Sequence, residues 1–314
     1  ITKNTSERVQ IGSFRFIFAF ATKIVIEAVT IYAVGWLGGG VVGWRTIAII
    51  YAIVGLITNT YSVFSVKELP EDEEETGAEG KPENNLTFLQ SFKVLLKNKY
   101  YVIICGSYIL TQLYGSVIGM GTYYTKYILG DETIFSTMSL AINVTMVLAL
   151  TMLPLVIKKL GGMYKLNIWG YVIAALGRVG VMIGGYMGSL PMMLAFTAVS
   201  TLGIAPLQGD MNALIACCSE YTTMKTGYRL EGMMYSCSSL GIKLGGALGT
   251  AICGWMLAAA GYVENAAVQT TATVNMLNFM YLWMPIIINA AVGFLLVFLR
   301  VEKANKDLIA EKSK

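Results

Sequence analysis

The chain has 314 residues, of which 55% are hydrophobic and only 13% are charged, and its mean hydropathy is +0.62. This composition is too apolar for an ordinary soluble domain and indicates a protein that crosses a membrane several times. The formal net charge is +4, but the basic residues lie between apolar blocks, which argues against a nucleic-acid partner. No histidine is present and the five cysteines lack metal-ligand spacing, so disulfides, zinc and histidine-based catalysis are not expected.

Eight stretches are long and apolar enough to cross the hydrocarbon core as helices, which takes about 20 residues each. They cover residues 12–37, 46–66, 101–128, 134–157, 166–188, 190–216, 231–260 and 276–299. Polar loops separate them, and most of these loops are short. The sequence therefore predicts an all-α membrane protein with eight transmembrane helices.

The lysine and arginine residues predict how these helices are oriented, because cytoplasmic loops retain basic residues. One side of the membrane receives Lys3, Arg8, Lys93, Lys97, Lys99, Lys158, Lys159, Lys165, Lys225, Arg229, Arg300, Lys303, Lys306, Lys312 and Lys314. The opposite side holds little more than Arg45 and Lys126. Both termini are therefore expected in the cytoplasm, which agrees with an even number of spans.

The longest polar break divides the chain. It opens with ELPEDEEETGAEGKPENN, which is too acidic and too rich in glycine and proline to bury a core. The following LTFLQSFKVLLKNKYY places its apolar side chains on one side of a helix, which predicts an amphipathic helix on the inner membrane surface. The sequence therefore predicts four parts. Residues 1–66 are the last two helices of a truncated N-terminal bundle, and 67–100 are a cytoplasmic linker with this helix. Residues 101–300 are a complete six-helix bundle, and 301–314 are a cytoplasmic tail.

Lys243 lies inside the seventh apolar stretch, where a charge costs roughly 2.5–3.5 kcal/mol unless a polar group interacts with it. Tyr235 and Ser239 precede it at intervals of four residues and so share its helical face. The favoured interpretation is a polar stripe that faces a cavity, and the alternative is a lysine neutralised by an acid for assembly alone. Another face carries a small-residue series that predicts a packing seam, formed by Gly241, Gly245 and Gly249.

Other charges within the spans have different interpretations. Lys23 and Glu27 are one turn apart and can satisfy each other, which favours a structural pair. Arg15 has no local acid and can present a planar fork of donors to sugar hydroxyls or a carboxylate. Arg178 either faces the cavity or pairs with an acid outside the sequence, and Asp210 lies at a depth that allows a pair with Arg15 between bundles.

Aromatic and amide side chains add to the polar content of the third, sixth and eighth stretches. They are Tyr108, Gln112, Tyr114, Tyr123, Tyr124, Tyr127, Gln208, Asn212, Asn278, Trp283 and Asn289. Sugar sites combine aromatic faces with polar groups, but tyrosine and tryptophan also anchor ordinary spans, so each residue taken alone favours a structural role. The sequence contains no Walker loop, no nucleophile with a base and no close carboxylate pair in a span, so an enzyme is not expected.

Several strings together resemble the glycoside-pentoside-hexuronide:cation symporters, the melibiose-permease-like branch of the major facilitator superfamily. ITKNTSERVQIGSFRF is similar to the segment that enters the family's fifth helix, with Thr2, Glu7, Arg8 and Arg15 at matching places. YYTKYILGD resembles the end of the seventh helix. The most specific block is SEYTTMKTGYRLEGMMYSCSSLGIKLGGALG, which is similar to the loop and start of helix eleven.

The resemblance implies a twelve-helix, major facilitator-type bundle in which this chain is equivalent to helices 5 to 12. Arg15 and Lys243 match positions that line the sugar and coupling region, while Arg229 and Glu231 match a polar entrance that closes a cytoplasmic gate. The residues expected in substrate binding or coupling are Arg15, Lys243, Tyr235, Ser239, Gln112, Tyr124 and Arg178. Those expected in gating are Arg8, Asp210, Glu220, Lys225, Arg229 and Glu231.

Two features set this chain apart from the family pattern. Where the family often has Ala-Asp-x-x-Asp-Tyr, residues 216–221 read ACCSEY, so one acid is lost and the other is lengthened to Glu220. The chain begins at Ile1 without an initiator methionine or a signal peptide, so we expect a fragment that lacks its N-terminal part. The family's cation-binding acids lie on helices two and four, which this sequence does not contain.

The expected function is sugar uptake coupled to Na+, H+ or Li+ by alternating access, in a monomer of the bacterial inner membrane with both termini cytoplasmic. The expected partners are a small sugar and the lipid bilayer, with no metal and no cofactor beyond a coupling cation held mostly by the missing helices. Two rivals stay open. One is a facilitator-fold carrier of a lipid or another non-sugar solute, and the other is a non-transporting membrane sensor.

Overall fold

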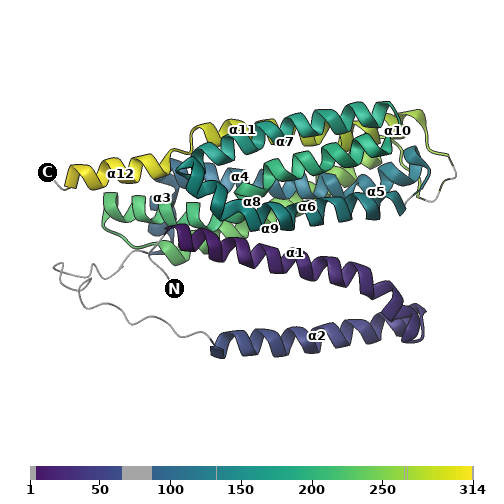
Figure 1. The fold of residues 1–314 in the computed structure, drawn as a ribbon, viewed down its shortest axis with the longest axis horizontal. Helices are drawn as coiled ribbons and strands as arrows, with labels where there is room; N and C mark the ends of the chain where they lie inside the picture. The colour runs from purple at the N-terminus through teal and green to yellow at the C-terminus, as the bar shows by residue number, and fades with distance from the viewer. Residues whose placement is uncertain (1–4, 66–86, 132, 265, 267, 313–314) are drawn as a thin grey trace.

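The computed structural model describes residues 5–65, 87–131, 133–264, 266 and 268–312, and it contains helices but no strand over these residues. Figure 1 shows an elongated bundle with a two-helix hairpin, α1 and α2, along one side. The start of α1 and the end of α12 lie toward the same end of the bundle, where α3 also lies.

The helices follow one another with short connections. Their bounds are α1 Thr5–Trp36, α2 Gly40–Ser65, α3 Phe88–Lys97, α4 Lys99–Gly119, α5 Gly121–Tyr124, a π-helix Thr125–Leu129, α6 Thr133–Leu160, α7 Met163–Tyr186, α8 Leu190–Thr226, α9 Glu231–Ala259, α10 Thr271–Asn278, a π-helix Phe279–Trp283, α11 Met284–Val297 and α12 Val301–Lys312. The hairpin turn between α1 and α2 uses three glycines with positive φ, Gly38, Gly39 and Gly40. Glycine reaches such backbone angles without the steric cost that a Cβ imposes.

Seven helical stretches in the described chain are long and apolar enough to cross a membrane, so the expected count of eight is not confirmed. The difference lies at α1, a helix of 32 residues in which the apolar piece found among the described residues is Ile17–Ile26. The other seven predicted spans each coincide with one apolar helical stretch.

Glycines set the closest helix contacts of the bundle. The pairs α7–α8 and α4–α9 pack most extensively. A Cβ added to Gly203 of α8 would overlap the backbone of Gly170 and Ala174 on α7. A Cβ on Gly245 of α9 would lie 2.7 Å from the Ile109 carbonyl oxygen of α4. Small residues at such places allow the helix backbones to pack directly against each other, which drives helix association in lipid.

The expected tail at 301–314 is largely helical instead, because α12 covers Val301–Lys312 and packs onto α8. Val301 is fully buried, and the Asn305 amide donates to the Cys217 carbonyl at 2.9 Å and to Glu220 Oε2 at 3.3 Å. The acidic part of the linker, 66–86, lies outside the described residues. The amphipathic helix that follows is present as α3, with Leu95 buried and its other large apolar side chains mostly exposed.

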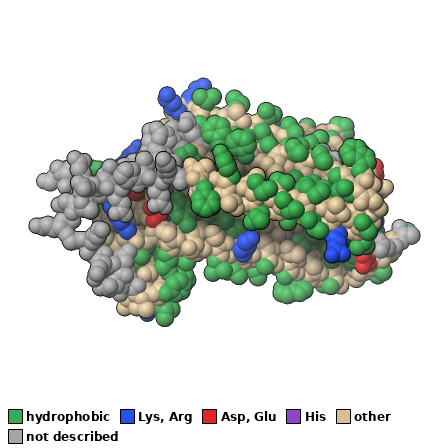
Figure 2. All heavy atoms as spheres, turned by 90° about the horizontal axis from the view of Figure 1, so that it is seen from below, with side chains coloured by type: hydrophobic (Ala, Val, Ile, Leu, Met, Phe, Trp, Pro, Cys, Tyr) green, Lys and Arg blue, Asp and Glu red, His purple; other side chains and the backbone are tan. Residues whose placement is uncertain are grey.

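Figure 2 shows the face on which the hairpin lies, where hydrophobic side chains cover most of the surface along the middle of the molecule. Basic side chains on this face are few, and they stand apart from one another along the middle. Such a surface suits the hydrocarbon core of a bilayer, whose lack of water favours apolar side chains over charged ones.

Candidate functional site

Helix α9 has two faces of opposite character. Gly241, Gly245 and Gly249 are buried, and the latter two lie against the backbone of α4, while nothing lies within 4 Å of a Cβ built on Gly241. At about 100° per residue, Lys243 points nearly opposite to Gly241. Lys243 and Ser239 are both exposed. The structure therefore places this ammonium outside the dry, packed interior.

Tyr235, which is predicted to share the Lys243 face, has a more structural setting. It is half-buried, and its hydroxyl donates to the Asn212 carbonyl oxygen of α8 at 3.0 Å. Gln112 is half-buried on α4, and its Cβ would lie 2.9 Å from a Cβ on Gly245. These two residues flank the packed side of α9 instead of sharing the open side with Lys243.

Arg15 is exposed on α1, which packs against α6 and α8. Tyr108 of α4 is buried in the hydrophobic core of the bundle. Its place in the sequence, among many tyrosines in one stretch, did not distinguish it.

Asp210 is completely buried in α8. Its Oδ2 accepts a hydrogen bond from the Asn167 amide of α7 at 2.7 Å, and its Oδ1 has no hydrogen-bond partner. The carboxyl group is therefore held from within the bundle by an amide that the sequence analysis did not select. Its pairing with Arg15 and its role in gating stay predictions.

Arg178 is also buried, with only 2% of its surface exposed, and its partner is a tyrosine. Nε and Nη2 donate to the Tyr114 hydroxyl at 2.9 and 2.6 Å, while Nη1 has no hydrogen-bond partner. Because the Tyr114 oxygen accepts both bonds, its own hydrogen is left to donate elsewhere. Tyr114 is half-buried on α4, so this pair joins α7 to α4.

Tyr124 lies in the core instead of an open site. It is fully buried and stacks on Tyr281, with ring centroids 4.6 Å apart and an interplanar angle of 25°. Its hydroxyl has no hydrogen-bond partner. Each ring lies within or directly beside a π-helical turn, Thr125–Leu129 or Phe279–Trp283. The structure thus gives Tyr124 a packing role between the two irregular turns.

Four of the six predicted gating residues lie around the end of α8 and the start of α9. Glu220 is exposed and accepts the bond from Asn305 of α12, and Lys225 lies 3.4 Å from the Tyr221 hydroxyl. Arg229 and Glu231 are exposed at the connection between the helices. Glu231 begins α9, where a carboxylate interacts favourably with the helix dipole.

One candidate, Arg8, has its side chain outside the described part of the chain. A cavity of about 310 Å³ at the loop between α6 and α7 contains none of the predicted sugar or gating residues. The described structure thus has an exposed lysine on α9, an exposed arginine on α1, and buried polar pairs that join α7 to α4 and to α8.

These features belong to a helical membrane protein, and comparison with known proteins identifies its family. Residues 1–303 match the model of a family described as MFS/sugar transport protein, and the chain belongs to this family. This confirms the resemblance found in the sequence.

Several curated proteins are similar to the chain. It is 26% identical over 321 residues to an isoprimeverose transporter of Lactiplantibacillus pentosus, and the aligned region covers 99% of this chain and 64% of that protein. A protein of Escherichia coli (strain K12) whose name proposes a glycoside/cation symporter, YagG, is 23% identical over 99% of this chain and 66% of its own length. A glucuronide carrier protein homolog of the same organism is 30% identical over 57% of this chain and 39% of its own length. The chain thus spans less than two thirds of the length of these relatives.

Proposed function

We propose that this chain is part of a sugar:cation symporter that works by alternating access. Membership of a sugar transport family and relatives with transporter names support this proposal. In such carriers two helical bundles rock about a binding site near the middle of the membrane, where substrate and coupling ion meet. The proposed substrate is a glycoside, pentoside or hexuronide, and the coupling ion is Na+, H+ or Li+.

The observation that carries the proposal is the exposed position of Lys243. It lies on a helix apolar enough to span a membrane, on the side opposite its packed glycines. An ammonium at such depth is tolerated where it meets water, an acid or a polar solute, as at the interface between two bundles. Exposed Ser239, one turn away, extends the polar surface.

The two rival functions have less support. A carrier of a lipid or another non-sugar solute would use a mostly apolar cavity, whereas the exposed Lys243 and Arg15 offer donors to hydroxyl and carboxylate groups. A non-transporting sensor would differ in function from the transporters, importers and symporters that the chain matches. We further propose that the protein lies in a bacterial inner membrane as a monomer with both termini in the cytoplasm.

The decisive experiment measures uptake of labelled glycosides, pentosides and hexuronides by the complete protein in proteoliposomes, with a Na+ or H+ gradient imposed. One charge that moves through 100 mV supplies roughly 2.3 kcal/mol, enough to concentrate a neutral sugar about fiftyfold. We expect Lys243→Gln to insert normally and to lose at least about nine tenths of the accumulated sugar. Lys93→Gln, at an exposed lysine of α3 outside the spans, is the matched control and should accumulate sugar normally.

Two results would count against the proposal. Wild-type protein that inserts but accumulates no member of the panel in either gradient would reject sugar symport. Accumulation by Lys243→Gln at the level of the control would reject the assignment of this lysine to coupling, because the ammonium would then have no part in the transport cycle.

A further inference from the structure

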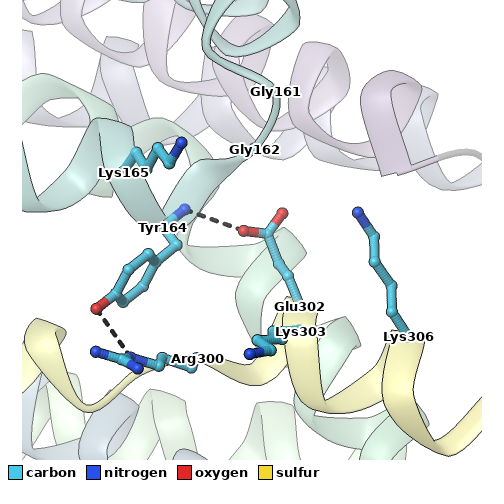
Figure 3. A pocket seen from close by; sticks show the side chains of 8 residues that line it. All are labelled: Gly161, Gly162, Tyr164, Lys165, Arg300, Glu302, Lys303 and Lys306. Carbon is cyan, nitrogen blue, oxygen red and sulfur yellow. Dashed lines mark hydrogen bonds between the residues drawn. The ribbon is translucent and has the colours of Figure 1, made fainter.

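The cavity of about 310 Å³ lies at the end of the bundle where α6 turns into α7 and α11 turns into α12 (Figure 3). The residues that line it are Gly161, Gly162, Tyr164, Lys165, Arg300, Glu302, Lys303 and Lys306. They come from two segments far apart in the sequence, which meet here because α7 and α11 pack against each other. A site built from two such segments is formed by the fold and not by one basic stretch.

The charges around the cavity are mostly positive. Lys165, Arg300, Lys303 and Lys306 face one acid, Glu302, so the lining carries four positive charges and one negative charge, a net of +3. Figure 3 shows these side chains around a common space. Like charges held this close are unfavourable on their own, so the cavity attracts an anion.

Glu302 also interacts with backbone groups at the start of α7. Its two carboxylate oxygens accept the backbone N–H groups of Met163 and Tyr164 at 3.3 and 3.0 Å, at the start of α7. A carboxylate there satisfies N–H groups that have no partner within the helix and interacts with the helix dipole. Arg300 Nε donates to the Tyr164 hydroxyl at 3.2 Å, which fixes one wall of the cavity.

The surroundings of the cavity are apolar on the bilayer side. Trp169 follows Lys165 by one turn of α7 and is 63% exposed, and Phe294 of α11 and Phe298, which directly follows that helix, are 65% and 54% exposed. The two phenylalanine rings lie 5.2 Å apart. Lys165 lies near the start of the apolar stretch Met163–Tyr186, and Arg300 lies three residues after the apolar helix α11 ends at Val297, so we place the cavity at the level where lipid headgroups meet the hydrocarbon core.

We propose that this cavity binds the phosphate of an anionic phospholipid headgroup, with the acyl chains beside Trp169 and Phe298. A free phosphate would meet the same basic side chains, but the exposed aromatic rings at the bilayer side favour a ligand with both a phosphate and hydrocarbon chains. Basic pockets between membrane helices bind lipid headgroups because their positive charges attract the phosphate at the membrane surface. The site is separate from the residues proposed for sugar transport.

The test titrates phosphatidylglycerol, phosphatidylcholine or inorganic phosphate into purified protein in detergent micelles and counts bound molecules by native mass spectrometry. We expect saturable binding of one phosphatidylglycerol and clearly weaker binding of phosphatidylcholine, whose headgroup has no net charge. Lys303→Gln/Lys306→Gln should weaken phosphatidylglycerol binding about tenfold. The matched control Lys93→Gln/Lys97→Gln removes the same charge from α3 and should leave binding unchanged.

Glu302→Gln adds a result that a folding defect would not produce. Removal of the only acid in the lining should strengthen phosphatidylglycerol binding several-fold, since repulsion of the phosphate is lost. In wild-type protein, brominated phosphatidylglycerol should quench tryptophan fluorescence saturably, and Trp169→Phe should remove most of that quenching.

Three outcomes would overturn the proposal. The first is equal affinity for the two lipids, and the second is equal weakening by the two double variants. The third is inorganic phosphate that binds as tightly as phosphatidylglycerol and displaces it, because the cavity would then be a site for the free ion.

Discussion

The hairpin α1–α2 and the bundle that begins at α4 are similar in hydropathy but differ in packing. The most apolar windows of α2 and α8 have mean hydropathies of 1.9 and 1.7, yet 11% of the first window is buried against 50% of the second. Trp36 and Phe64 of the hairpin are 87% and 84% exposed. Hydropathy thus indicates that a helix enters the bilayer but does not determine which helix it packs against.

What distinguishes the bundle is a set of contacts that hydropathy does not record. Gly203 allows α8 to touch the backbone of α7, and Asp210 and Arg178 each bond to a polar side chain of another helix. In the hairpin, a Cβ on Gly43 would overlap the Val34 carbonyl oxygen near the turn, but a Cβ on Gly55, farther along α2, would meet nothing within 4 Å. Helices in lipid associate through close packing and polar bonds, because lipid is as apolar as their side chains.

The largest effect should come from filling the glycine contact of the bundle. Gly203→Leu forces α7 and α8 apart, because the added Cβ already overlaps Gly170 and Ala174. We expect a loss of about 3 kcal/mol or more in the free energy of unfolding, measured by SDS-driven unfolding in mixed micelles. Gly55→Leu, the matched change in the hairpin, should be close to neutral. Equal losses of unfolding free energy from both variants would show that close packing of helix backbones does not distinguish the bundle from the hairpin.

A smaller effect should follow from removing one hydroxyl from each region. Tyr114→Phe leaves Nε and Nη2 of buried Arg178 without their acceptor, which should cost about 1.5–3 kcal/mol of unfolding free energy. Tyr51→Phe removes the hairpin contact between the Tyr51 and Thr30 hydroxyls, 2.9 Å apart and only partly buried. Its cost should be near the average of about 0.6 kcal/mol for polar contacts between membrane helices.

The same unfolding assay in mixed micelles measures both tyrosine variants. A Tyr114→Phe protein as stable as Tyr51→Phe would mean that water or another side chain replaces the lost acceptor. In that case the hydroxyl of Tyr114 would not be the group that holds Arg178 in place.

The sequence predicted the helices well because a span is a local property. Apolar length places seven helices, and the i, i+4 spacing of glycines in α9 identifies a face that is buried in the structure. The eighth predicted span, at α1, is not among the seven apolar stretches found in the described residues. The helix α12 within the expected tail could not be predicted, because Asn305 and Val301 hold it against α8 through contacts distant in sequence.

The candidate site could be predicted only in part, for the same physical reason. The exposure of Lys243 follows from its position relative to the glycines, which the helical period determines. The partners of Arg178 and Asp210 lie 64 and 43 residues away, on other helices, where no periodicity relates them. Asn167 could still have been selected from the sequence, because a polar residue within an apolar stretch usually has a polar partner.

The smallest expected effect is a change in how stability depends on pH, and it concerns the turns that connect helices in the two regions. The hairpin turn has positive-φ glycines, whereas the turn before α6 is held by Asp131, whose Oδ1 accepts bonds from the Thr133 backbone N–H at 2.8 Å and from its hydroxyl at 2.7 Å. These bonds favour the carboxylate, so they lower the pKa of Asp131 below its usual value. The stability that they contribute is therefore present above the unfolded pKa and is lost as the pH falls through the folded pKa.

Asp131→Asn should flatten this dependence, because an amide does not titrate. The unfolding midpoint of wild-type protein, measured between about pH 6 and pH 3, should fall more steeply at the acidic end than that of Asp131→Asn. Glu264→Gln removes another exposed loop acid and should leave the wild-type slope intact. Parallel curves for wild type and Asp131→Asn would mean that the bonds to Thr133 persist after protonation or that this turn opens without weakening the bundle. A turn built on glycine backbone angles has no such charge to lose, so pH should distinguish this connection from the hairpin turn.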